Sequence, residues 1–109
     1  MMLTKNGVEP FTCDNTPHWD QLGPTIKVNK GGGVINFADA RVIADAEAVR
    51  LSPDPMLLAW YESGTGEFSP RVECCCCKEK PGWLVYAERR GGEIQIVIND
   101  LEYVFIYRP

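Results

Sequence analysis

Four consecutive cysteines, Cys74 to Cys77, are the residues of this chain with the most chemical potential. In an extended segment alternate side chains share a side, with Cα atoms roughly 6.6 Å apart, so either alternate pair could chelate if the loop bends. A tetrahedral zinc site takes four nitrogen or sulfur ligands, which two of these thiolates could complete with residues near the N-terminus. The candidate zinc ligands are Cys13, His18 (the single histidine), Cys74, Cys75, Cys76 and Cys77.

The cysteine run has two other interpretations. In the first, a basic neighbour such as Lys78 helps one cysteine to ionise and another resolves the mixed disulfide. Glu73 and Glu79 lie equally close and oppose that ionisation, and adjacent cysteines close only a strained ring. In the second, which is the simplest, cysteine acts as a small hydrophobe and Arg71 to Cys77 is a buried strand. No C-x-x-C pair accompanies the run, so zinc is the alternative and not the leading hypothesis.

Two further motifs have ordinary structural interpretations. Gly31 to Gly33 precede a predicted helix but match neither G-x-G-x-x-G nor a Gly-Lys-Ser/Thr phosphate loop, so we interpret them as a flexible turn. His18 as a general base would need a nucleophile and an orienting carboxylate, and its irregular segment specifies no such geometry. We therefore assign no catalytic residue and favour a protein that is not an enzyme.

Composition limits the class of protein. The chain has 109 residues, of which 45% are hydrophobic and 24% charged, which is typical of one globular domain spanning residues 1–109. No apolar run approaches the roughly 18 residues of a membrane helix, and a net charge of -4 argues against nucleic-acid binding. The first 30 residues hold no apolar segment behind a basic start, so we expect no secretory signal and a cytoplasmic location.

One segment has a clear helical period. Residues 37–51 are predicted to form a helix with Asn36 as its N-cap, and Ser52-Pro53-Asp54-Pro55 ends it. Apolar residues at three- and four-residue steps predict one buried stripe, made of Ile35, Ala38, Val42, Ala46 and Val49 with Ile43 beside it.

The remaining segments predict a sheet. Residues 1–24 read as an irregular arm packed on the domain, because they are rich in proline and glycine yet carry apolar bulk. The predicted strands are Thr25 to Asn29, Met56 to Glu62, Trp83 to Glu88, Glu93 to Ile98 and Glu102 to Tyr107. The fold class is α+β: one helix packed on a four- to five-stranded, mainly antiparallel sheet that ends in a C-terminal meander, with residues 56–62 as an internal strand.

Alternation along the meander assigns two faces to that sheet. The face predicted to receive the helix carries Trp83, Val85, Ala87, Ile94, Ile96, Ile98, Tyr103, Phe105 and Tyr107. The other face is too apolar for simple solvation, with Leu84, Tyr86, Val97, Val104 and Ile106 as its candidate interface residues. One helix is about 22 Å long and 10 Å wide, whereas four strands spaced at about 4.8 Å make a sheet nearly twice that width, so the helix cannot cover all of the apolar sheet.

The uncovered face leads to the functional hypothesis. The N-terminal arm, the cysteine loop or a second copy could cover it, and a homodimer is the simplest choice. The alternative is that these are ordinary exposed aliphatic residues. The leading function is a non-enzymatic binding or assembly module that uses this face or a free sheet edge. The alternative function is a metal-binding (zinc) or thiol-redox protein built on the cysteine loop.

Residues 35–109 contain, in this order, the helix Asp39 to Ala48, a strand ending Ala59-Trp60-Tyr61, a Ser-Pro-x-x-x-Cys stretch from Ser69, and a final hairpin from Ile96 to Tyr107. This combination resembles a small prokaryotic family of unknown function. The resemblance implies a cytoplasmic prokaryotic protein and assigns no catalytic or binding residue. The four-cysteine run departs from the pattern of that family.

Overall fold

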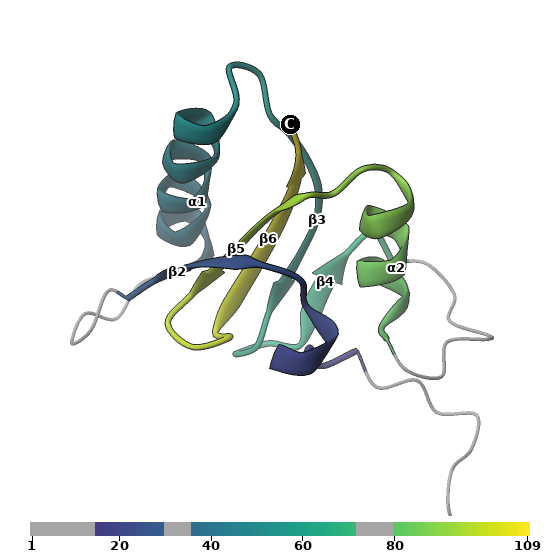
Figure 1. Cartoon of the computed structure of the whole chain (residues 1–109). Coiled ribbons are helices and arrows are strands. Elements are labelled where there is room, and N and C mark those ends of the chain that lie inside the picture. The colour runs from purple at the N-terminus through teal and green to yellow at the C-terminus, as the bar shows by residue number, and fades with distance from the viewer. Residues whose placement is uncertain (1–14, 30–35, 72–79) are drawn as a thin grey trace, which may run out of the picture.

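The computed structural model describes residues 15–29, 36–71 and 80–109. These residues form a five-stranded sheet in the order β2-β5-β6-β3-β4, with one helix packed on each face (Figure 1). The elements are the short 3-10 helix η1 (Trp19–Gln21), β2 (Thr25–Val28), α1 (Phe37–Leu51), β3 (Met56–Glu62), β4 (Glu67–Ser69), α2 (Gly82–Arg89), β5 (Ile94–Ile98) and β6 (Tyr103–Arg108). Neither α1 nor α2 is long and apolar enough to cross a membrane.

The sheet is mixed, and the α+β class is confirmed. β6 pairs antiparallel with β5 and β3, and β3 pairs antiparallel with β4, so β3 is internal as predicted. The edge strand β2 is parallel to β5, which makes the sheet less uniformly antiparallel than predicted. β4 is a second difference, because it falls in a segment that the sequence presents as a connection.

The hairpin between β5 and β6 turns at Asn99, Asp100 and Leu101, which lie between the last two predicted strands. All three residues have positive φ angles, 55°, 59° and 74°. Asn and Asp tolerate that region better than other residues, which explains two of the three positions. The Asn99 amide nitrogen donates to the Val28 carbonyl at 2.9 Å, and this bond fixes the turn against the end of β2.

Helix α1 has the predicted bounds but buries the side opposite to the predicted one. The Asn36 side chain accepts a hydrogen bond from the Asp39 amide at 2.8 Å, which confirms the cap. The buried residues are Ala40, Ala44 and Ala48, whereas the predicted buried stripe, where it is described, faces outward or sideways. Ile35 of that stripe lies outside the described residues. The sheet supplies most of the bulk on this face, so the fully buried positions of the helix are alanines, and the partly buried Phe37 and Ile43 pack against the same cluster.

The sheet residues under α1 agree with the predicted face. Ile94, Ile96, Ile98, Tyr103, Phe105 and Tyr107 form one cluster with the three buried alanines. The aromatic side chains pack against Phe37 at the start of α1, whose ring centroid lies 4.5 Å from that of Trp60 and 5.5 Å from that of Phe105.

The predicted strand Trp83 to Glu88 is wrong, because this segment is α2. Trp83, Leu84 and Ala87 are buried together on one side, at the spacing of a helical face. Residues 89–92, which would join two strands of the predicted meander, instead form the C-terminal cap of α2. Gly91 has a φ of 84°, and the Gly92 amide donates to the Ala87 carbonyl at 2.9 Å. Alternation and helical period both fit so short an apolar run, and the glycine pair decides between them.

Helix α2 covers the face that the sequence leaves open. A second cluster forms where Trp83, Leu84 and Ala87 of α2 pack on Val97, Val104 and Ile106 of the sheet. The sequence predicts Trp83 and Ala87 on the other face, the one under α1. Leu84, Val97, Val104 and Ile106 are therefore buried within one chain and cannot form the predicted interface, while Tyr86 is only half-buried. The geometric reason for placing a second copy on this face is removed.

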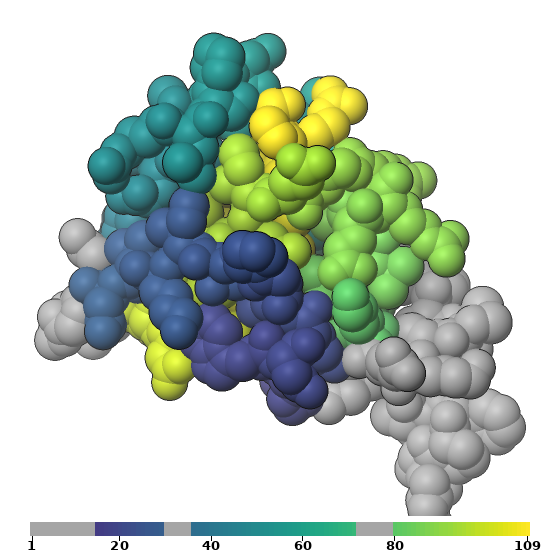
Figure 2. Space-filling view, in the orientation of Figure 1, coloured from purple at the N-terminus to yellow at the C-terminus, as the bar shows by residue number. Residues whose placement is uncertain are grey.

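Residues 15–24 complete the cover of this second face. Leu22 packs against the second cluster and Pro17 is fully buried. The Trp83 indole nitrogen donates to the Asn15 carbonyl at 2.9 Å, and the Gly23 amide donates to the Gln95 side chain at 3.0 Å. Figure 2 shows this segment, in purple and blue, against the green of α2.

Candidate functional site

The predicted zinc ligands fall almost entirely outside the described residues. Cys13 and the run Cys74 to Cys77 lie there, as do Gly31 to Gly33 and all but Arg71 of the possible strand through the cysteines. His18 is described: it caps η1, and its amide nitrogen donates to the Gln21 side chain at 2.9 Å. Residues 15–29, 36–71 and 80–109 contain no cluster of three metal-ligating side chains. The zinc site stays a prediction, which elemental analysis of the purified protein tests.

The outward side of α1 carries an apolar surface, which we call the outer stripe: Ala38, Val42, Ala46 and Val49. Val42 is 68% exposed and Val49 is 57% exposed. In the described part of the chain, the large apolar residues that are exposed are Trp19, Val42, Val49, Leu51 and Met56. Four of these five belong to α1 or to the first residue of the strand that follows it, so exposed apolar surface is concentrated there.

Charged residues border the outer stripe on both sides. At 100° per residue, Asp39 and Arg50 lie along one border, near opposite ends of the helix, and Arg41 and Asp45 lie along the other. Arg41 Nε and Asp45 Oδ1 are 3.2 Å apart, and Arg50 Nη1 lies 3.2 Å from Glu47 Oε1. The surface is thus an apolar strip between mixed charges, the pattern of a helix that packs against another element.

Helix α1 is held firmly on the sheet, so the outer stripe has a fixed position. The Tyr107 hydroxyl of β6 donates a hydrogen bond to Asp45 Oδ1 in the middle of the helix. Burial, and then the bond to the Asp45 carboxylate and its charge, raise the pKa of Tyr107 well above its ordinary value. The hydroxyl therefore keeps its proton, and the bond persists through the physiological pH range.

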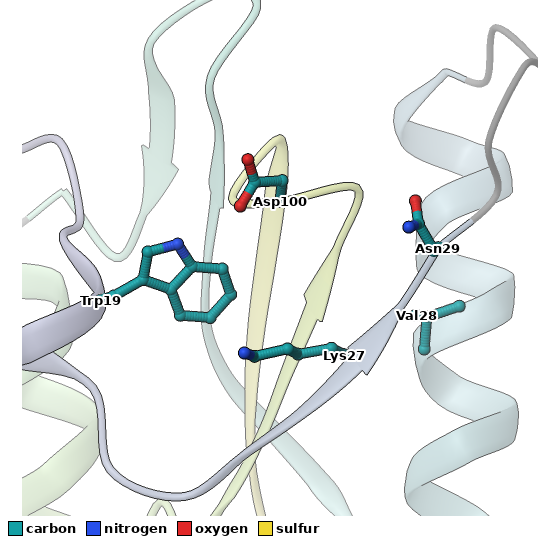
Figure 3. Close-up of a pocket in the computed structure, with 5 residues that line it drawn as sticks. All are labelled: Trp19, Lys27, Val28, Asn29 and Asp100. Atoms are coloured by element: carbon teal, nitrogen blue, oxygen red, sulfur yellow. The ribbon is translucent and has the colours of Figure 1, made fainter.

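A second candidate site is an open hollow of about 460 Å³ beside the end of the edge strand β2. Trp19, Lys27, Val28, Asn29 and Asp100 line it, as Figure 3 shows. The Lys27 Nζ lies 4.7 Å from the centroid of the Trp19 ring. The hollow therefore brings an aromatic surface, a cation and a carboxylate together at the carboxyl ends of β2 and β5.

Sequence reasoning located the residues of the outer stripe but placed them inward. A second helical stripe in the sequence could have corrected the predicted direction. Ala40, Ala44 and Ala48 also recur every four residues, on the opposite side of the same helix. Nothing in the sequence indicated the hollow, because its residues come from three segments separated by up to about 80 positions. Only the parallel pairing of β2 with β5 brings Lys27 near Asp100.

Comparisons with known proteins find relatives in one archaeon. An uncharacterized protein of Archaeoglobus fulgidus is 44% identical over 52 residues, which are 48% of this chain and 54% of that protein. The chain thus spans about half the length of this curated relative. A crystal structure of a novel protein from Archeoglobus fulgidus matches with a TM-score of 0.67 and 32% identity, over 80% of this chain and 94% of that one.

A family profile gives the same result. The profile of a domain of unknown function, DUF5619, matches residues 24–107, which include both α-helices and every strand apart from the last residue of β6. This confirms the predicted resemblance to a small prokaryotic family of unknown function. The chain belongs to the DUF5619 family.

Proposed function

We propose that this protein is a non-catalytic assembly module that forms a homodimer through the outer stripe of α1. One observation carries the proposal: a firmly seated helix turns alanines to its own sheet and valines to solvent. This contact takes the place of the interface predicted from the sequence, which lay on the sheet face that α2 covers.

The charges beside the stripe favour a second copy as the occupant. If two α1 helices pack antiparallel, the ends exchange places, so Asp39 of one copy lies opposite Arg50 of the other. The same pairing occurs twice, because a two-fold axis repeats it. Antiparallel packing also sets the positive end of each helix dipole beside the negative end of its neighbour. The surface is thus complementary to itself.

The size of the contact sets its strength. A helix of 15 residues is about 22 Å long, and helices with small side chains at their contact approach to about 8 Å. Such a contact lies at the small end of specific interfaces, near or below 1,000 Å² in total. We therefore expect a weak dimer whose population rises with protein concentration.

Sedimentation velocity over a concentration series tests this function. The wild-type protein is expected to move from monomer toward dimer as concentration rises. The double variant Val42→Gln/Val49→Gln is expected to remain monomeric, and glutamine forms helices at least as well as valine, so α1 is retained. Arg89→Gln, at the exposed end of α2, is the control and should dimerise like the wild type. A wild-type protein that stays monomeric throughout contradicts the proposal.

A charge exchange tests the antiparallel arrangement. Arg50→Glu alone places two acidic groups opposite each other and should weaken the dimer. Adding Asp39→Arg restores opposite charges at both contacts and should recover much of the association. If the double variant associates no better than Arg50→Glu alone, the arrangement is not antiparallel.

A further inference from the structure

We propose that the hollow beside Trp19 binds a small zwitterion, namely a free α-amino acid with an apolar side chain. In this arrangement Lys27 binds the carboxylate, Asp100 binds the ammonium group, and the exposed part of the Trp19 ring receives the apolar side chain. The proposal is independent of dimer formation, because α1 contributes no residue to the lining.

The charge pattern of the lining favours this class of ligand. Lys27 and Asp100 carry opposite charges, and within residues 15–29, 36–71 and 80–109 neither forms an ion pair. In Figure 3 the two side chains lie on different sides of the space next to the Trp19 ring. Asp100 repels a simple anion and Lys27 repels a simple cation, whereas a ligand with both charges is attracted by both.

The backbone positions the three groups in advance. Lys27 lies on β2, in register with Val97 of β5. Asp100 sits in the left-handed turn, which the bond from the Asn99 amide to the Val28 carbonyl ties to β2. The Lys27 ammonium group lies over the Trp19 ring, and this contact restricts the position of the lysine side chain. Binding therefore requires little reordering of the chain, which favours affinity.

The size and the place of the hollow fit a small ligand. Its volume of about 460 Å³ lies in the range of small-molecule sites. It opens beyond the carboxyl ends of the parallel pair β2 and β5. Trp19 is 37% exposed, so part of its ring is free to take an apolar group.

NMR titration with L-phenylalanine as the probe tests the site. The indole N–H signal of Trp19, assigned with Trp19→Phe, is expected to shift saturably, while the signals of buried Trp83 and of Trp60 stay in place. Phenethylamine lacks the carboxylate and 3-phenylpropanoate lacks the ammonium group. Each should bind at least about tenfold more weakly, because each loses one charge-assisted hydrogen bond.

Three variants connect the binding to the named residues. Asp100→Asn and Lys27→Gln should each weaken L-phenylalanine binding by about tenfold or more. Asp54→Asn, in the exposed loop between α1 and β3, is the matched control and should bind as the wild type does. The proposal fails if the Trp19 signal does not shift, if phenethylamine binds as well as the amino acid, or if Asp100→Asn and Asp54→Asn behave alike.

Discussion

The two helices cover opposite faces of one sheet in opposite ways. On the α1 side the fully buried residues of the helix are all alanines, with Phe37 and Ile43 partly buried beside them, and aromatic side chains of β6 provide much of the volume. On the α2 side the helix contributes Trp83 and Leu84, and the sheet contributes smaller residues such as Val97 and Val104. Either partner can supply the bulk of a close-packed layer, so the larger apolar residues of a helix need not face its sheet.

The outward sides of the helices differ as well. The exposed end of α2 is charged: Arg90 lies 3.8 Å from the centroid of the Tyr86 ring, and Lys80 Nζ lies 2.8 Å from a Glu88 carboxylate oxygen. The outward side of α1 presents Val42 and Val49 instead. Both helices belong to one chain, yet only α1 presents an apolar strip outward. We therefore infer that α2 faces solvent and that α1 faces a partner.

The largest effect is expected at the bulky residue of α2. Trp83→Ala should lower the free energy of unfolding by about 3 to 5 kcal/mol, measured by urea denaturation. Trp83 is fully buried, stacks on Tyr61 with centroids 5.6 Å apart, and donates a hydrogen bond to the Asn15 carbonyl. Trp19→Ala, at the partly exposed tryptophan, is the control and should cost about 1 kcal/mol or less. Equal losses would show that α2 is not the main cover of its face.

The next effect comes from the alanine side of α1. Ala44→Leu should destabilise the fold by about 1 to 3 kcal/mol, because Ala44 is fully buried against β5 and β6. Ala46→Leu adds the same atoms to the exposed side of the helix and should change stability by less than about 0.5 kcal/mol. The difference between these two variants measures the orientation of α1. If Ala46→Leu is the more destabilising, the helix is rotated relative to this structure.

How well the structure of a segment can be predicted from its sequence depends on whether that segment contains competing patterns. Asn36 and the prolines after Leu51 mark both ends of α1, so its bounds are predicted correctly. The face of α1 is not, because two sets of small and apolar residues share one period. In residues 83–88, strand and helix patterns coincide, and the glycine pair Gly91-Gly92 suits a hairpin turn as well as a helix cap.

The candidate sites show the same limit. The outer stripe is visible in the sequence because it lies within one helix, and only its direction is wrong. The hollow depends on the pairing of β2 with β5, which no local pattern specifies. Long-range parallel pairing is therefore where sequence reasoning stops.

A smaller effect is expected at the bond that joins α1 to β6. Tyr107→Phe removes the hydrogen bond to Asp45 and should cost about 1 to 2 kcal/mol at neutral pH. The folded pKa of Tyr107 lies above its unfolded value of about 10, because of burial and then Asp45. Its contribution is therefore complete below pH 10 and falls as the pH rises above it.

Urea denaturation at several alkaline pH values measures this loss. Burial, and then nearby acidic residues led by Glu62, also raise the pKa of Tyr103, so the variant keeps part of the alkaline sensitivity. Tyr107→Phe should lose stability above pH 10 less steeply than the wild type. Identical slopes would show that Tyr107 ionises as readily in the folded chain as in the unfolded one.

The smallest effect on stability is expected where the effect on association is largest. At concentrations where the protein is monomeric, Val42→Gln/Val49→Gln should change the free energy of unfolding by less than about 0.5 kcal/mol per site, because both side chains are already exposed. At concentrations that favour the dimer, the wild type should become the more stable of the two, since association stabilises the folded state by mass action. If the gap between wild type and variant is the same at every concentration, the valines act within one chain, and the contrast between α1 and α2 concerns folding and not assembly.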